Sequence, residues 1–330
     1  MANSAKFNLI VVAQRGRLAV ESVLLAASLH AQCPEFTGQF IVAEPQPNAR
    51  WSFDPRIGED VIYDALDELG AQVVPFENVQ FGEDYPNANK AECLHALPEG
   101  EPFLFLDTDT LVTGDLGTLA GNLDRPSASM LRTATWPKIE LYGPSYDEIW
   151  GALYEKFELN FETTLDLSHP DGYWQRYLYF NAGWFCGPCP QKFAQLYTDI
   201  MLGIRDTPPD ALVCQQLYPW LDQIALPLVI HALGGGRPDT TQSRLDGELT
   251  RHYRALPLLY ATASNEIIAA LEALVAPNRI KRALKTYEPW KRVLYQGRGE
   301  RARALFQNEP LPRHEQALRN RLRREKLWFR

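Results

Sequence analysis

The chain has 330 residues, of which 45% are hydrophobic and 22% are charged, proportions that are ordinary for a globular protein. This composition argues against wholesale disorder, and the length allows one large domain or two of ordinary size. No stretch approaches the roughly 20 apolar residues that a membrane helix requires, and the polar start with a short apolar run is not typical of a signal peptide. The five cysteines are an odd number, which suits a reducing compartment, so we expect a cytoplasmic protein.

The net charge of −8 is unevenly distributed along the chain. Residues 277–330 hold 16 Lys and Arg but only 5 Glu, whereas residues 1–276 hold 17 basic and 36 acidic residues. A basic segment of this kind either docks on the acidic body, contacts an anionic membrane or polymer, or is a solvated and partly helical tail. We therefore expect a basic extension, with peripheral contact at the inner membrane face as one of its roles.

The first 110 residues alternate short apolar runs with segments of helical periodicity, a pattern typical of a parallel α/β sheet. We expect strands over residues 7–13, 39–43, 72–76 and 103–106. Helices are expected over residues 18–31, 59–69 and 89–97. Crossover units of this type place ligands at the carboxyl ends of the strands.

After residue 120 the pattern is less regular. We expect strands over residues 177–185, 227–232 and 256–261, and helices over residues 191–202 and 265–275. The basic extension follows the last of these helices.

The strand expected over residues 103–106 leads directly into the triplet Asp107-Thr108-Asp109. Two carboxylates at a strand end can hold one hard cation, and a nucleotide diphosphate supplies further oxygen ligands. Such an ion stabilises the charge that develops on a leaving diphosphate. A D-x-D triplet alone is a weak signal, but its position after a buried strand indicates a metal or phosphate site.

Four segments together resemble the GT-A glycosyltransferases, in particular the family 8-like group. In chain order they are FLDTDTLV (residues 105–112), YFNAG (179–183), DQ (222–223) and RHYR (251–254). The resemblance spans residues 7–262, and it lies in the order and spacing of these parts. It implies a GT-A, Rossmann-like α/β domain over residues 1–262, followed by a helical basic extension over residues 263–330.

The resemblance implies a bound Mn2+ or Mg2+ with Asp107, Asp109 and His252 as ligands. The glycine and the Lys-Pro-Trp that usually follow this histidine in the family are missing here. Arg254 is therefore the candidate to replace the family's lysine at the diphosphate. His231, in an apolar run, is the rival metal ligand.

Further site residues follow from the same resemblance. Asp222 would lie near the reacting carbon of the sugar, while Gln223 and Asn181 would bond sugar hydroxyls. The candidates for contact with the nucleotide are Ala13 and Glu44 at strand ends, for base or ribose, and Lys90, for the diphosphate at a helix N-terminus.

Other interpretations of these motifs stay open. The segment 107–110 also fits the D-x-D-x-T motif of haloacid-dehalogenase-type phosphohydrolases, in which Asp107 would be the nucleophile and Asp109 the acid and base. A GT-A-like scaffold that binds nucleotide sugar without turnover is the non-enzymatic alternative. A sugar-nucleotide pyrophosphorylase would need a glycine-rich segment after the first strand, and residues 14–17 match one poorly. The Cys-Gly-Pro-Cys segment at 186–189 resembles a thioredoxin motif, but its place deep in the chain favours a turn with incidental cysteines.

The sequence thus predicts a metal-dependent hexosyltransferase that moves a sugar from a nucleotide diphosphate sugar to an acceptor hydroxyl. The acceptor would be a glycan, a lipid or a protein, and no nucleic-acid partner is expected.

Overall fold

The structure is a computed structural model that describes residues 6–131, 136–307 and 310–329. Three residues of the basic extension, 308, 309 and 330, and the first five residues of the chain lie outside the described part.

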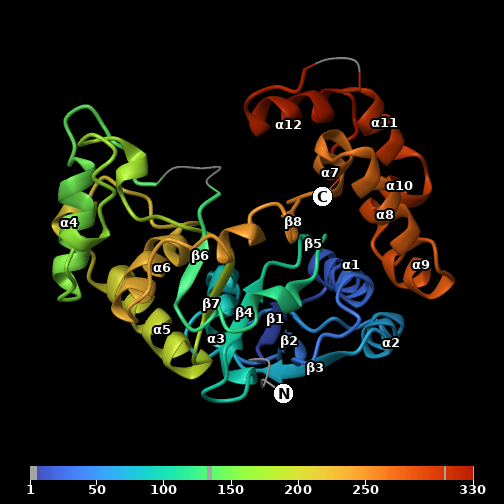
Figure 1. Cartoon of the computed structure of the whole chain (residues 1–330), viewed down its shortest axis with the longest axis horizontal. Coiled ribbons are helices and arrows are strands. Elements are labelled where there is room, and N and C mark those ends of the chain that lie inside the picture. Colours follow the sequence, from blue (N-terminus) through green and yellow to red (C-terminus); the bar gives the residue numbers. More distant parts are fainter. Residues whose placement is uncertain (1–5, 132–135, 308–309, 330) are drawn as a thin grey trace.

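A central sheet has the strand order β3-β2-β1-β4-β7-β6 (Figure 1). Its strands are β1 (Asn8–Val12), β2 (Phe40–Pro45), β3 (Ala71–Phe76), β4 (Phe103–Leu106), β6 (Ser127–Ser129) and β7 (Asn181–Gly187). Strands β1 to β4 are parallel, whereas β7 runs antiparallel to both β4 and β6. The four strands expected in the first 110 residues are confirmed, and their carboxyl ends share one edge of the sheet.

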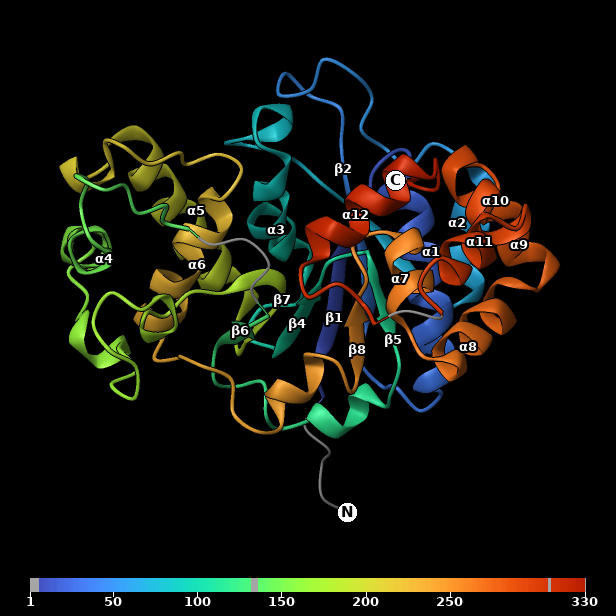
Figure 2. The same cartoon turned by 90° about the horizontal axis from the view of Figure 1, so that it is seen from above.

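Helices cover both faces of this sheet (Figures 1 and 2). Successive side chains of β1 alternate between the faces. Leu9 and Val11 pack with α1 (Arg17–Gln32) and α2 (Asp60–Glu68), and Ile10 and Val12 pack on the opposite side. That second layer contains α3 (Asn89–Glu92), α4 (Tyr146–Lys156), α5 (Pro190–Asp206) and α6 (Leu221–Ala232). All five residues of β1 are buried, as expected for a strand covered on both faces.

The basic extension is folded onto the body. It follows α7 (Leu256–Thr262) and forms α8 (Asn265–Val275), α9 (Asn278–Leu284), α10 (Glu288–Tyr295), α11 (Arg298–Ala304) and α12 (Glu315–Arg324). Helices α8 and α9 pack on α1, and α9 also packs on α2. Trp290 and Leu322 are buried in the same core cluster as Leu9 of the sheet. The extension therefore continues the core, and the boundary at residue 262 stays a prediction.

A small second sheet stands at the carboxyl edge of the main one. It pairs β5 (Thr110–Val112) with β8 (Thr250–His252) in antiparallel register. This pairing joins the segment after the D-x-D triplet to a segment far along the chain.

Three expected strands differ from the structure. Residues 227–232 belong to α6 and residues 256–261 to α7, so both strand predictions were wrong. Nearly all residues of these two helices are buried, and a helix buried on every side lacks the polar positions that reveal helical periodicity. The strand expected over residues 177–185 begins only at Asn181, in β7. The helix expected over residues 89–97 is an α-helical turn at 89–92 continued by a 3-10 turn at 93–96.

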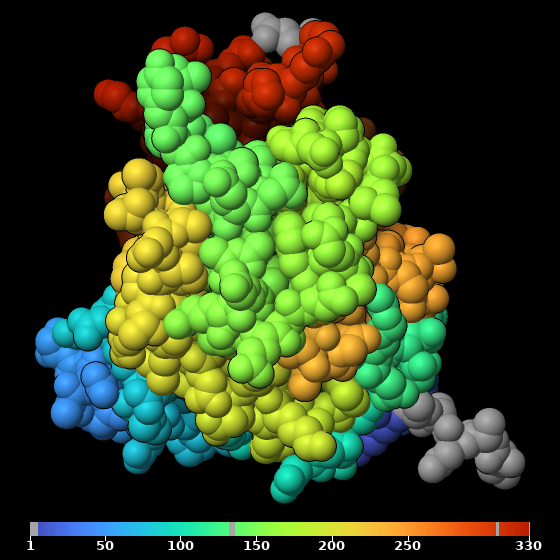
Figure 3. Space-filling model, turned by 90° about the vertical axis from the view of Figure 1, so that its left-hand side faces the viewer, coloured from blue at the N-terminus to red at the C-terminus, as the bar shows by residue number. Residues whose placement is uncertain are grey.

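The face beside α4 is built from the middle of the chain, coloured green to yellow, with the C-terminal helices in red at its top (Figure 3).

Within the described residues, no helix is both long and apolar enough to cross a membrane.

Candidate active site

Asp107, Asp109 and His252 converge at the carboxyl end of β4. The backbone N–H of Asp107 donates to the carbonyl of Gly183 at 2.8 Å, which ties the triplet to β7. Thr110 stands opposite His252 in the β5–β8 pair, and the N–H of Tyr253 donates to the carbonyl of Asp109 at 2.9 Å. The backbone pairing of β5 with β8 therefore holds the imidazole of His252 next to the two carboxylates.

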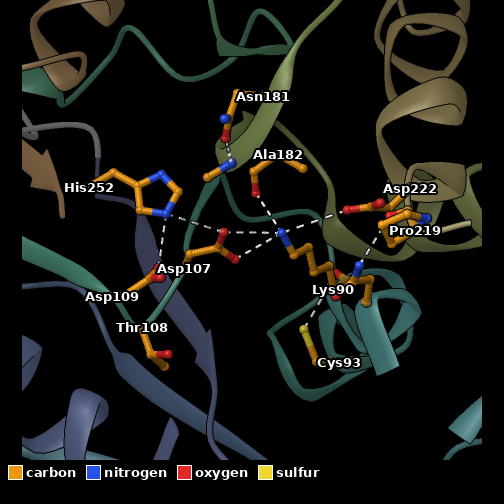
Figure 4. Close-up of polar contacts among 12 residues, drawn as sticks. Lys90, Cys93, Asp107, Thr108, Asp109, Asn181, Ala182, Pro219, Asp222 and His252 are labelled. Carbon is orange, nitrogen blue, oxygen red and sulfur yellow. Dashed lines mark hydrogen bonds and ion pairs between the residues drawn. The ribbon is translucent and has the colours of Figure 1, made fainter. Parts of the chain in front are cut away.

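The side-chain geometry of this cluster suits a divalent cation (Figure 4). His252 Nε2 lies 2.9 Å from Asp109 Oδ1 and 3.8 Å from Asp107 Oδ2. The three potential ligand atoms all lie within 4.8 Å of one another. Two carboxylate oxygens and one imidazole nitrogen form a mixed donor set that fits Mn2+ well. Among the described residues, no other group of His, Cys, Asp and Glu converges in this way.

Charges in the cluster are strongly coupled. Burial alone would raise the pKa of Asp109, but the nearby His252 and Arg17 hold that pKa well below its usual range. Burial opposes the charged form of His252, yet Asp109 and Asp107 raise the pKa of the imidazole above its ordinary value. The site thus attracts positive charge, whether a proton or a metal ion.

Gly183 leaves room for the imidazole. A Cβ atom at this position would lie 2.4 Å from His252 Nδ1 and 3.0 Å from Asn181 Oδ1. The Asn181 side chain accepts a hydrogen bond from the N–H of Gly183 at 2.9 Å, which holds the amide beside the cluster. Any side chain at position 183 would therefore collide with the imidazole of His252, which explains why the Asn-Ala-Gly segment ends in glycine.

Lys90, from α3, stands between the cluster and α6 (Figure 4). Its Nζ lies 2.9 Å from Asp107 Oδ1 and 3.7 Å from Asp222 Oδ2, and it donates to the carbonyl of Ala182 at 2.9 Å. Burial opposes the ammonium charge, but Asp107 and Asp222 outweigh it and raise the pKa of Lys90. This lysine links the D-x-D triplet to Asp222.

Asp222 is almost fully buried at the start of α6. Tyr85 donates to Asp222 Oδ1 at 2.6 Å and accepts from the Asp222 N–H at 3.0 Å. Burial raises the pKa of this carboxyl despite Lys90 and Tyr85. The neighbouring Gln223 accepts a hydrogen bond from Tyr179 at 2.8 Å.

A pocket of about 310 Å³ opens beside the D-x-D triplet. Its lining includes Gln14, Arg17 and Asn87 in addition to Lys90 and the triplet itself. The Arg17 guanidinium bonds Glu21 at 2.7 Å and lies 3.5 Å from Asp109 Oδ2. Sequence reasoning missed Arg17 as a site residue. The available signal was its position in the first turn after the first strand, at the same sheet edge as the triplet.

Four other candidates lie apart from the cluster. Glu44 accepts from the Ile57 N–H at 2.9 Å and from the Tyr63 hydroxyl at 2.5 Å, and neither Glu44 nor Ala13 lines the pocket beside the triplet. Arg254 has a positive φ of 62° and forms an ion pair with Glu315 of α12. His231 lies in α6 with its ring 5.6 Å from that of Tyr154, outside the three-residue cluster.

Cys186 and Cys189 are free thiols. Cys186 lies in β7 and is fully buried, and burial raises the pKa of its thiol to about 12. A thioredoxin-type nucleophile needs a lowered pKa, so this environment is the opposite of a redox site.

In a comparison with known protein families, the model of the Rhodobacterales glycosyltransferase domain matches residues 9–234. This chain belongs to that family. The match covers Lys90, the D-x-D triplet, Asn181 and Asp222, and it ends before His252. As a family member the protein is a glycosyltransferase, built on the mixed α/β fold with a mostly parallel sheet that the sequence predicts.

Two solved glycosyltransferase structures are among those similar to this chain. The bifunctional glycosyltransferase WbbM in its apo form has 13% identity and a TM-score of 0.47, covering 87% of this chain. The present chain spans about half of the WbbM chain, 52%. The galactosyltransferase LgtC, in complex with donor and acceptor sugar analogs, has 14% identity and a TM-score of 0.40, over 94% of this chain and 99% of its own. A search of curated proteins gave no match.

Proposed function

We propose that this glycosyltransferase moves a sugar from a nucleotide diphosphate sugar to an acceptor hydroxyl, with Mn2+ or Mg2+ at Asp107, Asp109 and His252. The observation that carries the proposal is the convergence of two carboxylates and an imidazole within 4.8 Å at a strand end. The imidazole favours Mn2+ over Mg2+, because Mg2+ prefers an all-oxygen shell. When bound, the ion supplies a positive charge that stabilises the leaving diphosphate.

The residues around the cluster have distinct roles in this proposal. The pocket beside the triplet, with Arg17 and Lys90 in its lining, receives the nucleotide diphosphate. Lys90 is placed to carry positive charge between Asp107 and the buried Asp222. Asp222 then faces the reacting carbon of the donor sugar, held in place by Tyr85.

Asn181 and Gln223 would bond sugar hydroxyls through the amide groups that their present partners leave free. Each amide oxygen already accepts one bond, from Gly183 and from Tyr179 respectively, and neither NH2 group donates to another described residue, so each is available to a substrate. Nucleotide contacts from Ala13, Glu44 and Arg254 remain part of the proposal. For Arg254, they require exchange of the ion pair with Glu315.

The test is substitution of Asp109 by Asn, which preserves shape and removes one ligand charge. We expect Asp109→Asn to lose metal-dependent binding of nucleotide diphosphates and turnover of the nucleotide sugar, while its melting temperature without metal stays within a few degrees. Asp67→Asn, on the exposed side of α2, is the matched control. Undiminished turnover in Asp109→Asn would contradict the proposal.

A panel of nucleotide diphosphates and nucleotide sugars, measured by thermal shift with and without Mn2+, identifies the donor class. A hundredfold excess of ligand over Kd stabilises the native state by about 2.7 kcal/mol. If nucleotide sugars raised the melting temperature but none of them was hydrolysed, the result would favour a protein that binds nucleotide sugar without catalysis. The family match favours the transferase over the phosphohydrolase, in which Asp107 would be phosphorylated by p-nitrophenyl phosphate.

Contact of the basic extension with an anionic membrane is a separate proposal. Deleting the extension cannot test it cleanly, because Trp290 and Leu322 are part of the core. Charge reversal of the exposed Arg324 and Lys326 leaves that core intact. This variant should lose binding to vesicles that contain phosphatidylglycerol, whereas reversal of Lys138, 82% exposed near α4, should not. Equal vesicle binding by both variants would rule out the extension as the membrane contact.

A further inference from the structure

A second and larger pocket, of about 450 Å³, lies beside His252. Its lining includes His252 and Gly183 but neither Asp107 nor Asp109, so it is distinct from the pocket beside the triplet. One wall comes from α7, from residues 311–313 and from Leu318 of α12. The C-terminal extension, which runs back over the sheet as α12 (Figures 1 and 2), thus helps to build this pocket. A volume of this size is typical of small-molecule sites.

Two exposed leucines line this pocket from opposite parts of the chain. Leu131 is 49% exposed and Leu311 is 45% exposed, although both are large apolar side chains. Behind them the lining contains the buried Leu245, Leu258 and Leu318. Exposed apolar side chains that converge on one cavity, rather than scatter singly, indicate contact with an apolar group.

The pocket also contains a half-buried guanidinium that has no carboxylate partner among the described residues. Arg251 is half-buried, and its one hydrogen bond among the described residues goes to the carbonyl of Thr262 at 3.4 Å. A half-buried arginine has donors to spare for an oxyanion, which its planar fork binds bidentately.

Three other charged groups of the lining, Arg254, Glu315 and Asp246, already have partners. Arg254 is paired with Glu315, which also accepts from Arg319 at 2.7 Å. The carboxylate of Asp246 accepts from Ser129, Trp184 and the Met130 N–H, at 2.6 to 3.0 Å. In addition, the buried hydroxyl of Thr110, another lining residue, has no hydrogen-bond partner within the described part of the chain. Among the described residues, the polar groups available to a ligand are therefore the guanidiniums of Arg251 and the exposed Arg313 and the hydroxyls of Thr110 and Tyr253.

We propose that this pocket is the acceptor site and that the acceptor is an amphiphile, with an apolar group against the leucines and an oxyanion on Arg251. The inference rests on the proposed function, because the donor then occupies the pocket beside the triplet. His252 lines this pocket and lies 2.9 Å from Asp109, which lines the pocket beside the triplet, so the acceptor would lie next to the reacting end of the donor.

Binding of n-octyl phosphate below its micellar concentration, measured by calorimetry, tests the proposal. We expect one saturable site per chain, with octyl glucoside and inorganic phosphate each bound at least tenfold more weakly. Octanoate in parallel shows whether the oxyanion is a phosphate or a carboxylate. Saturation with a nucleoside diphosphate and Mn2+ should leave the affinity for octyl phosphate unchanged, because the two ligands occupy different pockets.

Variants separate the two parts of the site. Arg251→Gln should bind octyl phosphate no better than octyl glucoside. The double variant Leu131→Asn, Leu311→Asn should bind both octyl phosphate and octyl glucoside with about tenfold lower affinity. It should fold, because both side chains are exposed.

Matched controls exist outside the pocket. Arg303 donates to the carbonyls of Tyr260 and Ala263 near the same end of α7, as Arg251 does to that of Thr262, but it does not line the pocket. Leu141, which is 86% exposed, is the control for the leucines. Arg303→Gln and Leu141→Asn should bind octyl phosphate like the unchanged protein.

The outcomes distinguish this inference from the proposed function. Absence of saturable octyl phosphate binding, or equal binding by the pocket variants and the controls, would overturn the inference while metal-dependent nucleotide binding stands. Displacement of octyl phosphate by the nucleotide would overturn the acceptor assignment. Amphiphile binding without any metal-dependent nucleotide binding would leave the amphiphile site supported and the proposed function refuted.

Discussion

Gly183 offers a direct test of how the fold positions the imidazole of the cluster. In Gly183→Ala, the new Cβ would lie 2.4 Å from His252 Nδ1 and 2.8 Å from Cε1, and contacts under 3.0 Å are essentially never seen for real Cβ atoms. The ring must therefore move by about 1 Å to restore ordinary contact. The shift acts on a ligand atom that now lies 2.9 Å from Asp109.

Metal coordination tolerates far less displacement than this. Ligand distances in metal sites vary by about 0.2 Å, and disturbing the groups that orient a ligand histidine costs about 10- to 100-fold in affinity. That loss corresponds to about 1.4 to 2.7 kcal/mol of binding free energy. We expect Gly183→Ala to weaken Mn2+ binding by this factor, measured by calorimetry with a saturating nucleoside diphosphate.

Gly187→Ala is the matched control, since Gly187 lies in the same strand and away from the cluster. Its added Cβ would lie 3.2 Å from Phe193 and 3.3 Å from Phe103, so it perturbs packing but no ligand. Both variants should lose about 1 to 3 kcal/mol of stability through overpacking, and only Gly183→Ala should lose Mn2+ affinity. If Gly183→Ala bound Mn2+ with an affinity within twofold of that of the unchanged protein, the assignment of His252 as a metal ligand held in place by the fold would be refuted.

Three further predictions concern the same site. The pKa of His252 is raised in the metal-free protein, so its ion pairs stabilise the folded state. This stabilisation is complete at pH values below the ordinary histidine pKa of about 6.5, and it is lost as the pH rises through the raised pKa. Urea unfolding in EDTA should therefore show a loss of stability with rising pH that His252→Gln lacks, while calorimetry should show Mn2+ affinity increasing over the same range. Tyr85→Phe removes both hydrogen bonds to Asp222 and should cost about 1 to 3 kcal/mol in urea unfolding; an unchanged midpoint would contradict the contact. Lys90→Met removes a cation 2.9 Å from Asp107. Calorimetry should therefore show that Mn2+ alone binds more tightly to this variant and that a nucleoside diphosphate binds about tenfold more weakly. If the two affinities changed in the same direction, Lys90 would not be the residue that binds the diphosphate.

Local sequence signals were sufficient where an element has one clear environment. Residues 103–106 form the expected strand and residues 265–275 the expected helix, because one is a short apolar run and the other has a regular amphipathic period. Residues 227–232 and 256–261 were misassigned since burial on all sides removes that period. Arg251 is part of the RHYR segment, but this motif does not reveal that its guanidinium lacks a carboxylate partner among the described residues, which follows only from the packing of α7 and α12 around the pocket.

The same limit explains which parts of the site could be foreseen. Asp107 and Asp109 are two residues apart directly after β4, so this local segment is enough to bring their carboxylates together. His252 was predicted through a family resemblance, but its placement depends on the β5–β8 pairing, which no local pattern encodes. That pairing has a functional consequence. β8 carries His252 between two neighbours, with Arg251 before it and Tyr253 after it, and all three line the larger pocket. The strand that brings His252 to the proposed metal site therefore also forms a wall of the proposed acceptor site, so a shift of the β8 backbone should alter metal and acceptor binding together.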